Sequence, residues 1–198
     1  MWYKPSGETG TFVTVLQGGR VQNNGLGRLQ VVIADPNRHM RTLLKGVLRA
    51  YGVRTIQEAN DGADAFKEMN LNPIDVVLVE YQMTPIDGME FVRLIRRAAD
   101  SPNPFCPVIM ITGHTERHVV ETARDLGVHE FLAKPITPEK LYGRLNKVLK
   151  KPRPFIQAPA YFGPDRRRRD DPRYKGRERR VRPPHHIPVT PPLAEEEV

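Results

Sequence analysis

The chain has 198 residues and a net charge of +8, and no run of 18 or more apolar residues that would predict a membrane-spanning helix. Its single cysteine, Cys106, excludes an intrachain disulfide and fits a reducing cytosol, so we expect a cytoplasmic protein.

The chain divides by composition into three parts. Residues 1–28 are glycine-rich and polar, and we expect them to be disordered. Residues 29–149 alternate short apolar runs with amphipathic segments of helical spacing. Five strand–helix units in about 120 residues predict a parallel sheet covered by helices on both faces, with ligands at the carboxyl ends of its strands. The apolar runs cover residues 29–34, 53–59, 74–80, 108–112 and 128–133.

Two of the amphipathic segments have a clear apolar face. Each set of apolar residues recurs at the spacing of one side of a helix, which predicts that this side packs on the sheet. In the first segment the set is Met40, Leu43, Leu44, Val47 and Leu48, and in the third it is Met89, Val92, Leu94 and Ile95.

Residues 150–198 form the third part, which is rich in proline and arginine and lacks apolar periodicity. Residues 161–182 contain ten Lys or Arg and four Asp or Glu, a net charge of +6. Such a segment cannot bury enough apolar surface to offset the entropy lost on ordering, so we expect a disordered tail. The pattern Tyr-x-Gly-x-acid-Arg-Arg occurs in it twice, at residues 161–167 and 174–180.

Acidic, hydroxyl and lysine side chains follow the apolar runs in a fixed order. In that order they resemble the receiver domain of two-component response regulators, over residues 29–149. The resemblance implies a flavodoxin-like (βα)5 fold with a parallel five-stranded sheet. The landmarks are Asp35, Glu80, Asp87-Gly88, Thr112 and Lys134-Pro135.

The resemblance implies a role for each residue near the reactive position. Glu80 stands where the family has the aspartate that accepts a phosphoryl group, and its carboxylate lies about 1.5 Å further from the backbone. Thr112 matches the hydroxyl that grips the phosphoryl group, and Lys134 matches the lysine that pairs with it. Phe131 stands at the place of a rotating aromatic residue, which core packing explains equally well.

The resemblance also implies a Mg²⁺ site that lacks one ligand. Asp35 matches the first acid of a pair, whereas Pro36 stands where the second acid is usual. Mg²⁺ takes one or two carboxylates and keeps several waters, so Asp35, Glu80 and the Gln82 carbonyl would form a weakened site. The alternative is that Asp35 only caps the following helix, with Pro36 at its first position.

Three interpretations of Glu80 stay open. It accepts phosphate poorly, or it mimics the charged state permanently by reaching toward Thr112 and Lys134, or it is a partly buried acid paired with Lys134. The displaced carboxylate and the missing metal ligand lead us to expect impaired or absent phosphorylation.

The tail is predicted to bind a partner, because its two repeats interleave aromatic and basic side chains. This mixture suits an acidic groove on a protein, and it also suits single-stranded bases. We expect a protein partner before nucleic acid, with a membrane surface or an inert linker as further alternatives. The predicted binding residues are Tyr161, Phe162, Arg166, Arg167, Tyr174, Arg179 and Arg180.

These features predict a signalling protein of a phosphorelay or two-component system that acts by protein–protein contact and is not an enzyme. The expected partner is a sensor kinase or a downstream signalling protein. Neither a glycine-rich phosphate loop nor a nucleophile elbow is present. The alternative is a nucleic-acid-binding adaptor that binds through its tail and uses the receiver as a scaffold.

Overall fold

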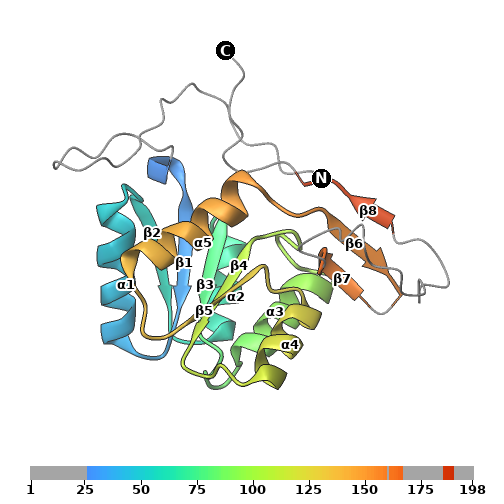
Figure 1. Ribbon diagram of the computed structural model, residues 1–198, viewed down its shortest axis with the longest axis horizontal. Coiled ribbons are helices and arrows are strands. Elements are labelled where there is room, and N and C mark those ends of the chain that lie inside the picture. The colour runs from blue at the N-terminus through green and yellow to red at the C-terminus, as the bar shows by residue number, and fades with distance from the viewer. Residues whose placement is uncertain (1–25, 160, 167–184, 190–198) are drawn as a thin grey trace, which may run out of the picture.

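A five-stranded parallel sheet covered by helices on both faces forms the body of the molecule (Figure 1). The structure, a computed structural model, describes residues 26–159, 161–166 and 185–189. The sheet has the strand order β2-β1-β3-β4-β5, and its five parallel strands confirm the predicted flavodoxin-like fold. Its strands are β1 (Gln30–Ala34), β2 (Thr55–Ala59), β3 (Val76–Val79), β4 (Val108–Thr112) and β5 (Glu130–Ala133). The helices are α1 (Arg38–Ala50), α2 (Gly62–Leu71), α3 (Gly88–Arg97), α4 (Arg117–Leu126) and α5 (Pro138–Lys150).

Alternation along the strands divides the core between the two faces of the sheet. In β1, Val32 and Ala34 point to the face covered by α2, α3 and α4, whereas Val31 and Ile33 point to the face covered by α1 and α5. Both sets are fully buried, because a parallel sheet with helices on both sides has no solvated face. This burial explains why β3 and β4 are continuous apolar runs in the sequence, whereas the edge strand β2 includes Gln57 and Glu58.

The helix faces agree with the sequence pattern except at single positions. Leu44 and Leu48 of α1 are buried, but Leu43 is 49% exposed, because it lies outside the stripe that faces the sheet. In α3, Met89, Val92 and Ile95 are buried as expected. Among the residues that the structure describes, no helix is long and apolar enough to cross a membrane.

Four of the five helices begin with a side-chain cap. The capping residues are Asn37 for α1, Asp61 for α2, Asp87 for α3 and Thr137 for α5, each accepting a hydrogen bond from a backbone N–H of the first turn. The residue before α4, Glu116, makes no such bond. The residue after the helix, Gly127, has the left-handed conformation (φ 103°).

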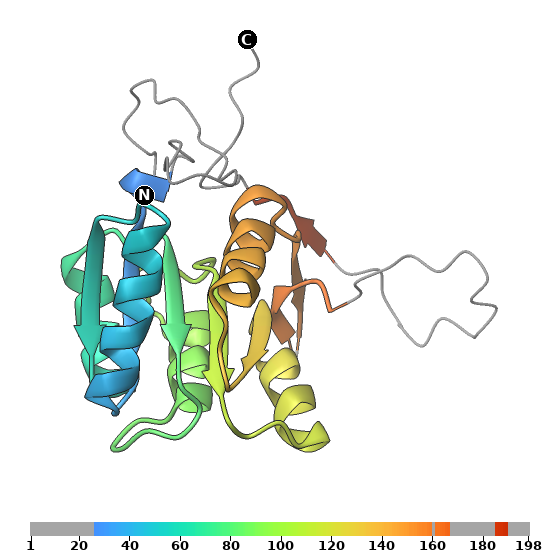
Figure 2. The same cartoon turned by 60° about the vertical axis from the view of Figure 1, so that its left-hand side comes forward.

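The chain after α5 packs against the receiver, which corrects the prediction that nothing beyond residue 150 packs. Strands β6 (Phe155–Ala158) and β7 (Tyr161–Pro164) form an antiparallel hairpin, and β8 (His185–Ile187) pairs with the other edge of β6. Phe155 has no exposed surface, and Tyr161 is 8% exposed. This small sheet lies at the side of the molecule opposite α1 and β2 (Figures 1 and 2).

The amino-terminal boundary is corrected in the same way. Residues 26–28, predicted to be disordered, form a 3-10 turn in which Leu26 is buried against the α1–α5 side of the core. Buried residues of the folded part therefore lie both before Leu29 and beyond Lys150. Residues 1–25, 167–184 and 190–198, which include most of the predicted tails, lie outside the described part of the chain.

Candidate signalling site

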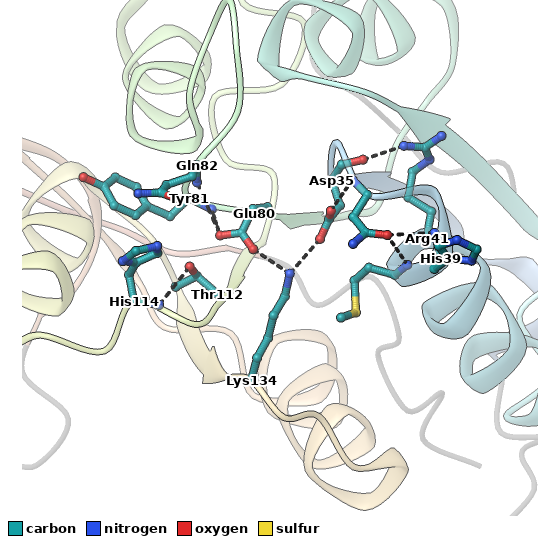
Figure 3. Close-up of polar contacts among 11 residues, drawn as sticks. Asp35, His39, Arg41, Glu80, Tyr81, Gln82, Thr112, His114 and Lys134 are labelled. Carbon is teal, nitrogen blue, oxygen red and sulfur yellow. Dashed lines mark hydrogen bonds and ion pairs between the residues drawn. The ribbon is translucent and has the colours of Figure 1, made fainter.

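The candidate site lies at the point of the sheet where the order of the parallel strands reverses. Strands β1 and β3 are neighbours, and the strands that follow them in sequence go to opposite sides, so a crevice opens at their carboxyl ends. Asp35 follows β1 and Glu80 follows β3 at this crevice, while Thr112 ends β4 and Lys134 follows β5. The structure therefore brings these four predicted residues together (Figure 3).

Lys134 lies between the two carboxylates and pairs with both. Its Nζ is 2.6 Å from Glu80 Oε2 and 2.9 Å from Asp35 Oδ2. Burial lowers the pKa of Lys134, but its hydrogen bonds and charge attraction to Glu80 and then Asp35 outweigh this, and the pKa is raised above its usual value. The pairing of Glu80 with Lys134 agrees with the sequence prediction, and Asp35 is an additional partner.

The second carboxylate oxygen of Glu80 is also engaged. Glu80 Oε1 accepts hydrogen bonds from the backbone N–H groups of Tyr81 (2.6 Å) and Gln82 (3.3 Å). The loop that supplies these donors is fixed by a further backbone hydrogen bond, from the N–H of Gly88 to the Tyr81 carbonyl at 2.9 Å. A side chain at Gly88 would place its Cβ only 2.2 Å from the Glu80 carbonyl oxygen, so this position requires glycine.

Asp35 holds the turn into α1 but does not cap that helix. Its Oδ1 accepts from the N–H of Asn37 at 2.8 Å, and the Asn37 side chain then caps α1. Arg41 of α1 donates to the Asp35 carbonyl oxygen at 2.6 Å. The alternative of helix capping by Asp35 is therefore wrong, because the helix is capped two residues later, by Asn37.

Thr112 and Phe131 border the site on its other side. Thr112 is buried, and its Oγ1 accepts from the backbone N–H of His114 at 3.2 Å. The His114 ring packs edge-on against Tyr81, with 5.7 Å between the ring centroids, so the loops after β3 and β4 are in contact. Phe131 is half-buried against the core and does not lie among the hydrogen-bonded groups of the site.

A hollow of about 290 Å³ opens beside the site, over β5 and between α4 and α5. Its floor is apolar and its rim is basic, and the β5 residues that line it directly precede Lys134. The residues that line it are Thr115, Val120, Phe131, Leu132, Ala133, Lys140 and Arg144.

The arrangement of Asp35, Glu80 and Gln82 at the crevice limits how Mg²⁺ can bind. Asp35 and Glu80 supply two carboxylates at one crevice, which is the number that Mg²⁺ commonly takes from a protein. However, the Lys134 ammonium lies between them, and Gln82 meets the carboxylate through its N–H. No group of three or more His, Cys, Asp or Glu suited to a metal occurs among the described residues. The residues fit a weak site in which the ion competes with Lys134.

Three of the seven predicted binding residues of the tail lie in the part of the chain that the structure describes, and four lie outside it. Tyr161 is buried, Phe162 is half-buried, and Arg166 pairs with Asp125 of α4 at 2.8 Å. All three therefore make contacts within the molecule. The other four predicted binding residues lie outside the described part, namely Arg167, Tyr174, Arg179 and Arg180.

Two of the buried polar residues that were not anticipated from the sequence lie close together. Arg96 of α3 is 4% exposed and His129, just before β5, is 3% exposed. Both side chains lie at the junction between the receiver and the β6–β7 hairpin, beside Phe155. A signal was present in the sequence, since Arg96 follows Ile95 on the apolar side of α3 and His129 lies within an apolar run.

A doubly wound sheet with two acids at its switch point, a hydroxyl after β4 and a lysine after β5 defines a receiver-type signalling domain. The response regulator receiver domain model matches residues 31–146, and the chain belongs to this family. The receiver domains of this family function in signal transduction.

Similar proteins support the same assignment. The chemotaxis protein CheY-3 of Vibrio cholerae is 30% identical over 123 residues, which cover 62% of this chain and 93% of that protein. The structure of CheY4 from Vibrio cholerae is 27% identical and superposes with a TM-score of 0.57, covering 61% of this chain and 98% of that one.

Receiver domains bind Mg²⁺ at this position of the fold. One solved example is the receiver domain of a sensor histidine kinase from Pseudomonas aeruginosa, which has a magnesium ion in its active-site cleft. It is 24% identical, with a TM-score of 0.54, and covers 60% of this chain and 95% of that one. At this identity the likeness concerns the fold alone.

Proposed function

We propose that this protein is an atypical response regulator that signals by protein–protein contact and does not depend on phosphorylation. The observation that supports this best is the engagement of both Glu80 oxygens. Oε2 is paired with Lys134, and Oε1 accepts from two backbone N–H groups. Both oxygens of this carboxylate are restrained by hydrogen bonds, and we infer that it is poorly placed for in-line attack on a phosphodonor.

The longer side chain of Glu80 also supports a permanent charge at the site. Glutamate carries its charge about 1.5 Å further from the backbone than aspartate does. At that reach it contacts Lys134 directly, and the net charge of Asp35, Glu80 and Lys134 together is negative. We propose that this fixed arrangement takes the place of the phosphorylated state.

Mg²⁺ has a secondary role in this proposal. If the ion binds, Asp35 and Glu80 hold it, and Lys134 must withdraw from at least one of them. The ion supplies charge neutralisation for a phosphoryl group in receiver chemistry. In this chain Lys134 already neutralises the two acids, so the metal is not needed to keep the site formed.

The hollow between α4 and α5 is the proposed partner surface. Its apolar floor includes Phe131 and Val120, and its rim carries Lys140 and Arg144. Such a surface fits an acidic, amphipathic segment of a protein, with the apolar side chains in the hollow and the acids at the rim. Lys134, which pairs with Glu80, directly follows the β5 residues that line the hollow. The fixed charge of Glu80 therefore acts on this surface over a short distance.

Incubation with Mg²⁺ and acetyl phosphate is expected to leave the mass of the wild-type protein unchanged. The double substitution Pro36→Asp with Glu80→Asp restores both missing groups, and we expect it to gain one phosphoryl group. Its rate should exceed that of the wild type by roughly 100-fold or more, the typical penalty of a misplaced group. Glu80→Asp alone should restore little. Rapid labelling of the wild type that disappears in Glu80→Gln would refute the proposal.

Substituting Lys134 by alanine is expected to lower the free energy of unfolding by about 1–2 kcal/mol, between the values for exposed and buried pairs. The loss arises because Asp35 and Glu80 then repel each other without a cation. Adding Glu80→Gln should recover part of it, and urea unfolding of both single variants and the double variant measures the coupling. Arg117→Ala, which breaks the exposed Arg117–Glu121 pair, is the matched control. Strictly additive effects of Lys134→Ala and Glu80→Gln would show that the two side chains do not interact.

A further inference from the structure

The β6–β7 hairpin packs on the ends of two receiver helices. Strand β7 lies against α3 and α4, on the far side of the sheet from α1. Its Gly163 approaches the end of α4 so closely that a Cβ there would lie 2.9 Å from the Gly127 Cα and 2.8 Å from the Tyr161 hydroxyl. The contact with Gly127 is backbone against backbone, so no movement of a side chain there can make room for a Cβ.

Arg96 joins the hairpin to the receiver. Its guanidinium donates to the carbonyl oxygens of Pro104 (2.7 Å), Cys106 (2.9 Å) and Gly127 (3.0 Å), and the Phe155 ring covers it with its centroid 5.3 Å from the guanidinium carbon. Burial lowers the pKa of Arg96 to about 10. The Gly127 carbonyl stands at the end of α4, where the helix dipole is negative, so Arg96 compensates that end.

Arg166 completes the contact with α4 from the other side. Its guanidinium carbon lies 4.5 Å from the centroid of the Tyr161 ring, and its Nη1 pairs with Asp125 at 2.8 Å. Burial raises the pKa of Asp125, but the hydrogen bonds from Arg166 and Arg124 outweigh it, and the pKa is lowered. The last turn of α4 is therefore held by Arg96, Gly163 and Arg166 together.

The opposite end of α4 is held less firmly. Helix α4 begins at Glu116 with no side-chain cap, directly after the loop of Thr112 and His114 that borders the site. Thr115 and Val120, at this end, line the hollow over β5. Helix α4 packs on the sheet through Val119 and Ala123 and is clamped at its carboxyl end, so a shift of that end moves the helix residues that line the hollow.

We propose that the β6–β7 hairpin is an intramolecular clamp on α4 that shapes the hollow between α4 and α5. The clamp uses residues beyond the end of the family match at residue 146, so it is a feature of this chain that the receiver fold itself does not supply. Its effect on partner binding rests on the proposed function, but the clamp itself does not.

Amide hydrogen exchange of the full-length chain tests the clamp without a partner. In Gly163→Ala we expect the amides of α4 to exchange roughly tenfold faster or more, while those of α1 and α5 keep their wild-type rates. Asp125→Asn, which weakens the ion pairs of Asp125 with Arg166 and with Arg124, should give a smaller increase of roughly two- to fivefold. Amide chemical shifts of Thr115 and Val120 should move in both variants.

Gly143→Ala is the matched control, because a Cβ at this position of α5 meets no atom within 4 Å. It should leave α4 exchange unchanged. Unaltered α4 rates in a folded Gly163→Ala variant would overturn the proposal, and so would an equal increase in every helix, since the hairpin would then only add global stability. A failed clamp and a phosphorylated wild-type protein are independent results, so each proposal stands or falls by its own experiment.

Discussion

Substituting Phe155 by alanine is expected to reduce the free energy of unfolding by about 3–5 kcal/mol, as for other large side chains in a core. Phe155 is fully buried, although it lies in a segment whose composition predicts disorder. Its ring contacts Phe105 and Phe162, with centroids 5.0 and 5.4 Å away, and it covers Arg96. The alanine variant would lose these contacts and leave Arg96 beside a cavity. Urea unfolding monitored by circular dichroism measures the loss.

Two further variants test whether the loss of stability comes from the packing of the hairpin on the receiver. Gln157→Ala changes an exposed residue of the same strand and should alter stability by less than about 0.5 kcal/mol. Ending the chain at Lys151 removes Phe155 with the whole hairpin, and we expect at least the loss seen in Phe155→Ala. A truncated chain as stable as the full one would mean that the hairpin does not belong to the folded unit.

The five receiver strands were predictable because a parallel sheet buries both of its faces. Continuous apolar runs are its signature, and the runs at 29–34, 53–59, 74–80, 108–112 and 128–133 each contain one observed strand. The acids and the lysine at the site were predictable for the same reason, since they follow the runs. Leu43 was misassigned because its neighbours on α1 leave it outside the buried stripe.

The hairpin was not predictable from average composition, because only a few of its side chains are buried. Its apolar residues come in two pairs, Phe155-Ile156 and Tyr161-Phe162, on either side of a proline-containing turn. Two short apolar segments around a turn are a hairpin signal, which the surrounding arginines obscured. One of the arginines in this segment, Arg153, stabilises the hairpin, because it donates to the carbonyl oxygens of Asp165 and His129.

The hairpin also changes the interpretation of the repeated Tyr-x-Gly-x-acid-Arg-Arg pattern. In the first copy three positions serve the fold: the Tyr161 hydroxyl donates to the Pro164 carbonyl at 2.6 Å, Gly163 allows close approach, and Arg166 pairs with Asp125. Two equivalent, freely accessible docking points are therefore not expected. Inward packing of Tyr161 also removes one of the stacking residues on which the nucleic-acid alternative depended.

A loss of stability below pH 6.5 is expected from His129. Burial, and then the charges of Arg96 and Arg153, hold the pKa of His129 well below its usual value. Its Nδ1 accepts from the Val108 N–H at 3.2 Å and faces Arg96 Nη2 at 3.3 Å, so the ring is neutral in the folded chain. In the unfolded chain it regains a pKa of about 6.5. Below that pH only the unfolded state takes up this proton, and the free energy of unfolding falls by about 1.4 kcal/mol per pH unit.

Urea unfolding at intervals between about pH 5 and 8 measures this slope, above the range in which carboxylates dominate. The wild type should be level above about pH 6.5 and lose roughly 2 kcal/mol by pH 5. His129→Asn keeps an acceptor for the Val108 N–H but has no proton to gain, so its curve should stay level across the same range. His39→Asn, at an exposed position at the start of α1, should retain the wild-type slope. Equal slopes in the wild type and His129→Asn would show that His129 takes up its proton without unfolding, and that the junction between the hairpin and the receiver tolerates a second charge beside Arg96.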